Sequence, residues 1–439
     1  MWYIFVVLTG LFILPIWVFR YPVMGDYPIH LFKVQVMTEY MNPLFEFNKY
    51  FTIYPLPCFY SLSYYTILGL SKLFPIQIAG KIFLTLYVIL MPLSVIYFLR
   101  AHNRSGLTAI ISFPLIYNSF LHKGNIGFVA SIPATLVGLG YLVRHQNNRT
   151  IKTFTIGSIL LLIAYLLHPY SLCVIGLVIF ITKELRKYLT TIVPSLILLV
   201  INLLTLPGEV DLLVRWLSPL MKVRELVIYF FSFSYLMEVV LILPIYGLYL
   251  YLFMRSSYSV EVSHRIRLTN YQLIGLSICA FFVLPDYFME CDHTAQRLLP
   301  FLLCFGIAAF REPCEYKLNL PLLVIPLLVL YLGIIWLSWR NINAVYTYYH
   351  SVLKNIHKKS ELIVSANGAD LYIGQINVFG HFQLYRLIEL GGGISETQFF
   401  HGPPVIYKHS HPFKGPKRVI RFEKLDCLYN IEIVPKQVH

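Results

Sequence analysis

Long apolar runs recur along almost the whole length of this chain of 439 residues. Several of them reach 16 to 28 residues, and a helix needs roughly 20 apolar residues to cross the hydrocarbon core of a bilayer. Only 13% of the residues are charged, against about 25% in a typical soluble domain. A soluble fold of this length would need far more polar surface to cover its core. The runs therefore predict a membrane-embedded, mainly α-helical protein.

The runs predict a polytopic transmembrane bundle of about eleven spans. The first run, Trp2 to Phe19, has no basic flank before it and no small-residue cleavage site after it, so we interpret it as a retained span. A further run, 56–74, is also long enough to cross. The expected spans are 3–19, 77–99, 106–121, 126–143, 152–168, 169–183, 188–206, 227–253, 270–288, 297–310 and 319–339.

The distribution of Lys and Arg predicts the direction of these spans. Thirteen of these residues lie in the loops at 100–105, 144–152, 183–187, 254–269 and 311–318, and five lie in the alternate short loops at 122–125, around 168, at 207–225 and at 285–297. By the positive-inside rule, the first set of loops is cytoplasmic. The N-terminus is then inside if 56–74 lies flat at the outer interface, and outside if 56–74 crosses. The hydroxyl groups and the lysine of 56–74 favour the flat position. We expect the protein in the inner (cytoplasmic) membrane.

The composition changes near residue 340. Residues 1–339 form the predicted transmembrane domain, whose first outer loop spans 20–76. Residues 340–439 are mixed and polar and predict a small extracytoplasmic α/β domain. Its elements are strands at ELIVSA (361–366), VIRF and IEIV, and a helix at 376–390 that stops at Gly391 to Gly393.

The net charge of +14 does not indicate nucleic-acid binding, because the sequence lacks a basic recognition helix and an aromatic-studded sheet. The seven cysteines are scattered, without metal-ligand spacing. We therefore interpret the positive charge through the bilayer, and most of the cysteines as core residues.

The most prominent local pattern is GDYPIHLFKVQVM (25–37), directly after the first span. Asp26 can cap a helix that tolerates Pro28 near its start. Asp26 and His30 are four residues apart and so share one helical face at the water–lipid boundary. One interpretation is a helix cap beside an interfacial histidine. The other is a carboxylate held where a lipid-linked substrate presents its headgroup.

A second cluster lies in PDYFMECDHTAQRLLPF (285–301), between two expected spans. A charge close to the hydrocarbon, such as that of Arg297, is costly unless it is paired or faces a water-filled cavity. Arg297 therefore either pairs internally with Asp286 or Asp292, or binds a phosphate through its planar fork. Glu290, Asp292 and His293 also leave room for a divalent cation, although their spacing is not specific.

Isolated polar residues mark the remaining candidate positions. Glu238 is the one charge in its apolar run and is expected to face a partner inside the bundle. His168 precedes Pro169 at an expected outer turn. Lys123 lies at another outer turn, beside Gly124. Taken singly, His168 and Lys123 favour a structural role over a catalytic one, and Glu238 fits either role.

The pattern of a first span, an outer loop with an acidic residue and an amphipathic helix resembles the GT-C superfamily of membrane glycosyltransferases. The segments PLPCFYSLSYYTILGLSKLF (55–74) and QIAGKIFLTLYVILMPLSVIYFLR (77–100) extend the resemblance over residues 1–210. The tail HFQLYRLIELGGGISETQFFHGPPVIY looks like tails of poorly characterised bacterial membrane proteins of this type. The sequence departs from the commonest first-loop motif, two adjacent acidic residues, because Gly25 and Tyr27 flank Asp26.

The resemblance implies transfer of a sugar from a polyprenyl-phosphate donor to an acceptor on the outer face of the membrane. It implies Asp26 as general base, His30 as its aid, and Arg297, His293, Lys123 and His168 as phosphate-binding residues. Candidate acidic partners are Asp286, Glu290, Asp292 and Glu238. No cofactor is required by this chemistry, and the expected partners are the lipid-linked sugar and membrane lipid. The alternatives are a transporter, flippase or polymerase of lipid-linked saccharides, and a non-catalytic protein of envelope assembly.

Overall fold

The fold is that of a computed structural model of the whole chain. It describes residues 2–54, 57–205, 214–228, 233, 244, 247–248, 251, 264–288, 291–309, 320–354, 361–366, 372–373, 376–379, 381–390, 394–395, 405–407, 417–425 and 428–435.

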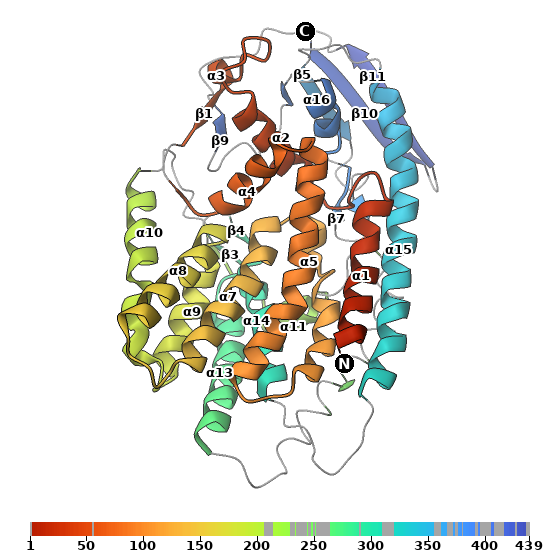
Figure 1. Cartoon of the computed structure of the whole chain (residues 1–439). Coiled ribbons are helices and arrows are strands. Elements are labelled where there is room, and N and C mark those ends of the chain that lie inside the picture. Colours follow the sequence, from red (N-terminus) through yellow and green to blue (C-terminus); the bar gives the residue numbers. More distant parts are fainter. Residues whose placement is uncertain are drawn as a thin grey trace.

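The described part of the chain is mostly helical (Figure 1). Its α-helices are α1 (Trp2–Val18), α2 (Tyr27–Thr38), α3 (Phe47–Tyr50), α4 (Ser61–Ser71), α5 (Ile76–Ala101), α6 (Ser119–Lys123), α7 (Ile126–Arg144), α8 (Ile151–Leu167), α9 (Tyr170–Ile181), α10 (Val193–Thr205), α11 (Pro219–Ile228), α13 (His264–Val283), α14 (Leu299–Ala309), α15 (Leu320–Leu353) and α16 (Gln383–Leu390). Short 3-10 helices are η1 (Gly106–Leu115), η2 (Arg186–Ile192) and η3 (Ala295–Leu298).

Within the described residues, four helical stretches are long and apolar enough to cross a membrane: Ile76–Ala101, Ile126–Arg144, Arg186–Thr205 and Leu322–Leu353. Shorter apolar helices, α1, α8 and α9 among them, pack beside these stretches (Figure 1). A mostly helical fold with helices long and apolar enough to cross a membrane is therefore shown, whereas the count of eleven spans stays a prediction. Most of the expected span 227–253 lies outside the described residues.

Three expected helices differ from the sequence prediction. The continuous span at 106–121 is wrong: η1 covers Gly106–Leu115 in 3-10 geometry and contains Pro114, which has no N–H to donate to an α-helical ladder. The last span does not end at 339, because α15 continues to Leu353 and crosses the expected domain boundary at 340. Within 56–74, helix α4 has 11 residues, which is about half the length needed to cross a bilayer.

One end of the bundle gathers the N-terminus and the turns that follow α5, α7 and α9. The guanidinium carbon of Arg100 lies 5.3 Å from the ring centre of Trp2. Arg104 donates to the carbonyl of Ala308, at the end of α14 (3.3 Å). The turn after α7 accepts hydrogen bonds from the segment after α9. The basic loops thus share one end of the molecule with the first residues of the chain.

The opposite end gathers α2, α3, α4 and α16 together with β1 (Phe51–Ile53), β5 (Glu361–Ala366), β10 (Lys417–Leu425) and β11 (Leu428–Pro435) (Figure 1). The C-terminus of α1 also lies here. Lys81, on α5, donates to the Phe19 carbonyl (2.7 Å) and so satisfies a carbonyl left open where α1 stops. Asn343, on α15, exchanges two hydrogen bonds with the backbone of Tyr21. These contacts fix the start of the first loop against the last long helix.

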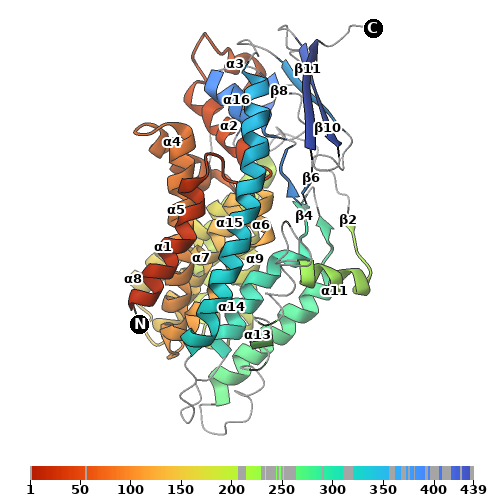
Figure 2. The same ribbon diagram turned by 90° about the vertical axis from the view of Figure 1, so that its right-hand side faces the viewer.

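A mixed four-stranded sheet stands beside the upper part of α15 (Figure 2). Its order is β11-β10-β5-β8, with β10 antiparallel to β11 and parallel to β5. The predicted strands ELIVSA, VIRF and IEIV are confirmed, whereas the helix predicted from 376 begins at Gln383. The strands are β1 (Phe51–Ile53), β2 (Val214–Arg215), β3 (Tyr287–Phe288), β4 (Cys291–Asp292), β5 (Glu361–Ala366), β6 (Tyr372–Ile373), β7 (Ile376–Asn377), β8 (Ile394–Ser395), β9 (Val405–Tyr407), β10 (Lys417–Leu425) and β11 (Leu428–Pro435).

The first loop and the C-terminal segment are joined by backbone pairing. β1 pairs antiparallel with β9, in the register Phe51 to Tyr407. Aromatic rings from three places also pack together: the segment between α1 and α2, helix α15, and the start of α16. Among them, Tyr346 stacks on Phe382 with 4.3 Å between ring centres. The C-terminal segment therefore packs directly on the region that holds Asp26.

Candidate active site at one end of the bundle

The position of Asp26 is set by a close approach of two turns. The backbone N–H of Gly25 donates to the carbonyl of His122 (2.8 Å), and that of Asp26 donates to the carbonyl of Lys123 (2.9 Å). Gly124 ends α6 with φ +94°, and a Cβ atom there would lie 2.6 Å from the Asp26 nitrogen. Only glycine fits this position without displacing the turn. The sequence thus fixes Asp26 and Lys123 as neighbours.

The side chain of Asp26 does not cap α2, so the predicted cap is wrong. The helix begins as expected, with proline in its first positions, but the carboxylate turns elsewhere. Its Oδ1 atom lies 3.7 Å from Nε2 of His381, and the side chain is 40% exposed. A carboxylate not used by the helix end, and open to solvent, is available for chemistry.

His30 lies one turn further along α2, on the face of Asp26, as the spacing predicted. Its Nδ1 atom is 2.7 Å from the hydroxyl of Tyr64, on α4, and its ring also hydrogen-bonds the carbonyl of Gly124. Burial, and then the charge of Lys33, lower its pKa to about 3. His30 is therefore neutral near pH 7 and positions α4 and α6 around Asp26.

Lys33 belongs to this group, although the sequence analysis did not single it out. The residue is 5% exposed, and its Nζ atom lies 5.9 Å from the ring centre of Tyr64. Burial lowers its pKa to about 8, and interactions with Cys58 and Asp26 oppose that shift. Its spacing of three from His30 and seven from Asp26 was the available signal, because those positions share one helical face.

A second group surrounds Arg297, in η3. The side chain is buried, with Nη1 2.8 Å from Nε2 of His168. Its guanidinium carbon lies 5.0 Å from the ring centre of Phe128 and 5.4 Å from that of Phe120. Aromatic faces stabilise a cation held in this way. Arg297 and His168 are thus brought together although 129 residues separate them in the chain.

Lys123 and His293 complete this cationic group. The Nζ atom of Lys123 lies 5.8 Å from the ring centre of Phe120, the same ring that Arg297 contacts. Burial lowers the pKa of His293 to about 3, and the charges of Lys123 and Arg297 add to this shift. The four predicted phosphate-binding residues are therefore linked: Arg297 contacts His168, shares the Phe120 ring with Lys123, and interacts with His293.

Helix α4 joins the two groups. The ring of Tyr60, which precedes α4, packs edge-on against His168, with 4.8 Å between ring centres. One turn later, Tyr64 contacts His30. The backbone hydrogen bond from Asp26 to Lys123 is a second link between the group around Asp26 and the group around Arg297. Asp26 and Arg297 are thus linked by contacts that run through α2, α4, α6, η3 and the turn after α8.

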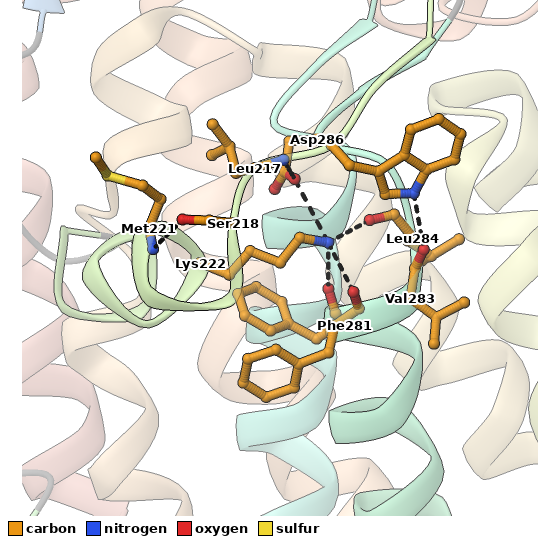
Figure 3. Close-up of polar contacts among 10 residues, drawn as sticks. Leu217, Ser218, Met221, Lys222, Phe281, Val283, Leu284 and Asp286 are labelled. Carbon is orange, nitrogen blue, oxygen red and sulfur yellow. Dashed lines mark hydrogen bonds and ion pairs between the residues drawn. The ribbon is translucent and has the colours of Figure 1, made fainter.

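Asp286 does not belong to this site, so its pairing with Arg297 is wrong. Its Oδ2 atom lies 3.4 Å from Nζ of Lys222 and accepts from the backbone N–H of Leu217 (Figure 3). Lys222 is 1% exposed and donates to the carbonyls of Phe281, Phe282 and Leu284. These carbonyls are left open where α13 ends, and a lysine there is favoured by the helix dipole. The pair is a buried helix cap.

The side chains of the remaining acidic candidates lie outside the described part of the structure. Glu238 and Glu290 lie outside the described residues, and Asp292 is described by its backbone in β4. Among the described residues, no group of three His, Cys, Asp or Glu side chains is placed to hold a metal ion.

His381 is a site residue that sequence reasoning missed. It is 3% exposed and comes from the C-terminal segment, just before α16. Its sequence context, a histidine next to Phe382 in a mixed polar and apolar segment, does not reveal a contact with Asp26. The pairing follows from the packing of α16 on α2, which no local pattern encodes.

Comparison of the chain with models of known protein families gives no match, and comparison with curated proteins gives none either.

Proposed function

We propose that this protein is a membrane glycosyltransferase that moves a sugar from a polyprenyl-phosphate donor to an acceptor hydroxyl. One observation carries the proposal: contacts link a solvent-reaching carboxylate, Asp26, to a half-buried lysine and a buried arginine at one end of a helical bundle. That arrangement matches a reaction that needs a base for the acceptor and positive charge for a phosphate leaving group.

Asp26 is the proposed general base. It accepts the proton of the acceptor hydroxyl while the hydroxyl oxygen bonds to the anomeric carbon, and the bond from that carbon to the phosphate oxygen breaks. Polyprenyl phosphate leaves with the electron pair, and attack from the opposite face inverts the sugar. Base catalysis of this kind contributes typically about 10²–10⁴-fold. The 40% exposure of the side chain gives an acceptor access to it.

Arg297 and Lys123 are the proposed phosphate-binding residues. Arg297 is held by His168 and by two aromatic faces, so its planar fork is oriented before a ligand binds. The neutral ring of His293 lies within interaction range of both charges and hydrogen-bonds the side chain of Gln296. Fixed donors around developing negative charge lower the barrier because they need no rearrangement during the reaction.

The arrangement of the two ends supports an outer location for the site. The basic turns after α5, α7 and α9 lie with the N-terminus, and positively charged loops stay in the cytoplasm. Helix α2, which follows Asp26, lies at the other end with α4 and the four-stranded sheet (Figure 1). We therefore infer about eleven crossings, an inner-membrane location, interfacial placement of α4 and an extracytoplasmic C-terminal segment.

The test is turnover by the purified protein with a panel of polyprenyl-phosphate sugars. Asp26→Asn is expected to lower kcat by about 10²–10⁴-fold, because it removes the base. The matched control is Glu46→Gln, another carboxylate of the first loop, with a side chain 35% exposed and paired with Lys49. An exposed pair contributes at most about 1 kcal/mol, so this variant should keep wild-type kcat. Full turnover by Asp26→Asn would sink the base assignment.

A further inference from the structure

The C-terminal segment packs closely against the turn that holds Asp26. Gly25 has no room for a side chain, because a Cβ atom there would lie 2.9 Å from the carbonyl oxygen of Asn377. Tyr346, on α15, donates to the carbonyl of Val378 (2.7 Å) and fixes the same segment. Figures 1 and 2 both show α16 beside α2 at this end. The segment that leads to His381 is thus held by two contacts, one with the turn at Gly25 and one with α15.

His381 and Asp26 differ in their access to solvent. The His381 side chain is 3% exposed, whereas that of Asp26 is 40% exposed. The imidazole therefore lies behind the carboxylate, away from the space an acceptor would enter. Burial lowers the pKa of His381 to about 4, so the ring is neutral near pH 7 and carries one N–H. A neutral ring there can orient a carboxylate but cannot itself reach an acceptor.

We propose that His381 is the positioning residue of Asp26: its buried Nε2–H faces Oδ1, donates to it in the substrate complex, and holds the carboxylate toward the acceptor. This inference rests on the proposed transferase function. The 3.7 Å separation is long for a hydrogen bond, and contacts of this kind tighten when substrate binds. The C-terminal segment is then part of the active site, and the N-terminal bundle is incomplete without it.

The first experiment compares His381→Gln with His381→Asn in the full-length protein. The amide nitrogen of glutamine superposes on Nε2, whereas that of asparagine falls near Nδ1. Gln should keep kcat within about threefold, and Asn should lose about 10- to 100-fold in kcat at unchanged KM, as for a small misplacement of a reacting group. The control is His350→Gln, a buried histidine near the same ring cluster (Tyr21 to His350, 6.0 Å). Equal kcat for Gln and Asn would overturn the proposal.

The second experiment combines the asparagine variant with Asp26→Asn. A residue that acts through Asp26 has nothing left to position, so the double variant should match Asp26→Asn alone. A further loss of kcat in the double variant would show a merely structural role and would overturn the proposal.

A third measurement separates this proposal from the transferase function. If the wild-type protein turns over no donor, the function fails, and ¹⁵N NMR of histidine-labelled protein still tests the contact. The Nε2 resonance of His381, identified by its loss in His381→Gln, should shift in Asp26→Ala and stay unchanged in Glu46→Gln. An unchanged resonance in Asp26→Ala would overturn the proposal.

Discussion

Lys33 brings a titratable positive charge to within interaction range of Asp26, and this predicts a pH limit for the site. Its pKa is lowered to about 8 by burial, so the charge that faces Asp26 is lost above that pH. We expect kcat/KM to fall above about pH 8 in the wild-type protein. Lys33→Arg keeps its charge at higher pH, so the fall in kcat/KM should occur at a higher pH. Lys33→Met should have a low kcat/KM at every pH and show no such fall.

The measurement is kcat/KM from about pH 6 to about pH 10, a range in which ordinary Asp and Glu side chains stay ionised. The same shift has a consequence for stability. Because the folded pKa lies below the ordinary value of 10.5, the unfolded chain binds more protons between the two values, and the contribution of Lys33 to stability rises with pH there. If kcat/KM of Lys33→Arg fell with the same pH midpoint as that of the wild-type protein, the assignment of this fall to Lys33 would be wrong.

The two residues that the sequence analysis missed differ in how far they were predictable. Lys33 shares a helical face with Asp26 and His30, so a fuller use of helical spacing would have found it. His381 meets Asp26 through packing between segments that are far apart in the chain, and one sequence holds no local signal for that. Asp286 shows the reverse case: its charge was visible, but its partner Lys222 was set by where α13 ends.

At the scale of elements, the turn after α6 is the feature on which the site geometry depends most directly. Gly124 adopts φ +94°, and any side chain at this position would collide with the backbone of Asp26. We expect Gly124→Ala to cost about 1–3 kcal/mol through backbone strain, and to lower kcat because it pushes Asp26 away from Lys123. The matched control is Gly69→Ala, in α4, where a Cβ atom meets nothing within 4 Å.

Thermal unfolding in detergent and donor turnover check this prediction together. Gly69→Ala should be neutral or stabilising by about 0.5–1 kcal/mol, because alanine is the better helix former. Wild-type turnover by Gly124→Ala would show that the close approach of the two turns is not needed.

Element boundaries were predictable where the pattern was strong and local. The strands ELIVSA, VIRF and IEIV have the β-branched composition that sheets favour, and they are found as predicted. The apolar run 106–121 reads as a helix by composition, but its core position and Pro114 favour a 3-10 segment that hydropathy cannot distinguish. The polar start of 340–353 hides a helix that continues because its apolar face packs on the bundle.

At the scale of the whole molecule, the charge pattern predicted which turns share an end, and the contacts at both ends agree with it. Arg100 meets Trp2 at one end, and Asp26 meets Lys123 at the other. What composition could not supply is the meeting of the first loop with the C-terminal segment through β1 and β9. Pairing between distant strands depends on tertiary register, which a single chain's hydropathy does not encode.

The orientation of the bundle is the last prediction, and the transferase proposal depends on it. Asn48 and Asn147 are both exposed, one in the first loop and one in the turn after α7. In a chain whose native cysteines are replaced, we expect Asn48→Cys to react with a membrane-impermeant maleimide on intact cells. Asn147→Cys should react only after permeabilisation, because its turn carries the basic residues that stay inside. The reverse labelling would place Asp26 on the cytoplasmic side, away from a donor presented at the outer leaflet. The carboxylate and the cations would then still form one site, but one that needs a substrate from the cytoplasm.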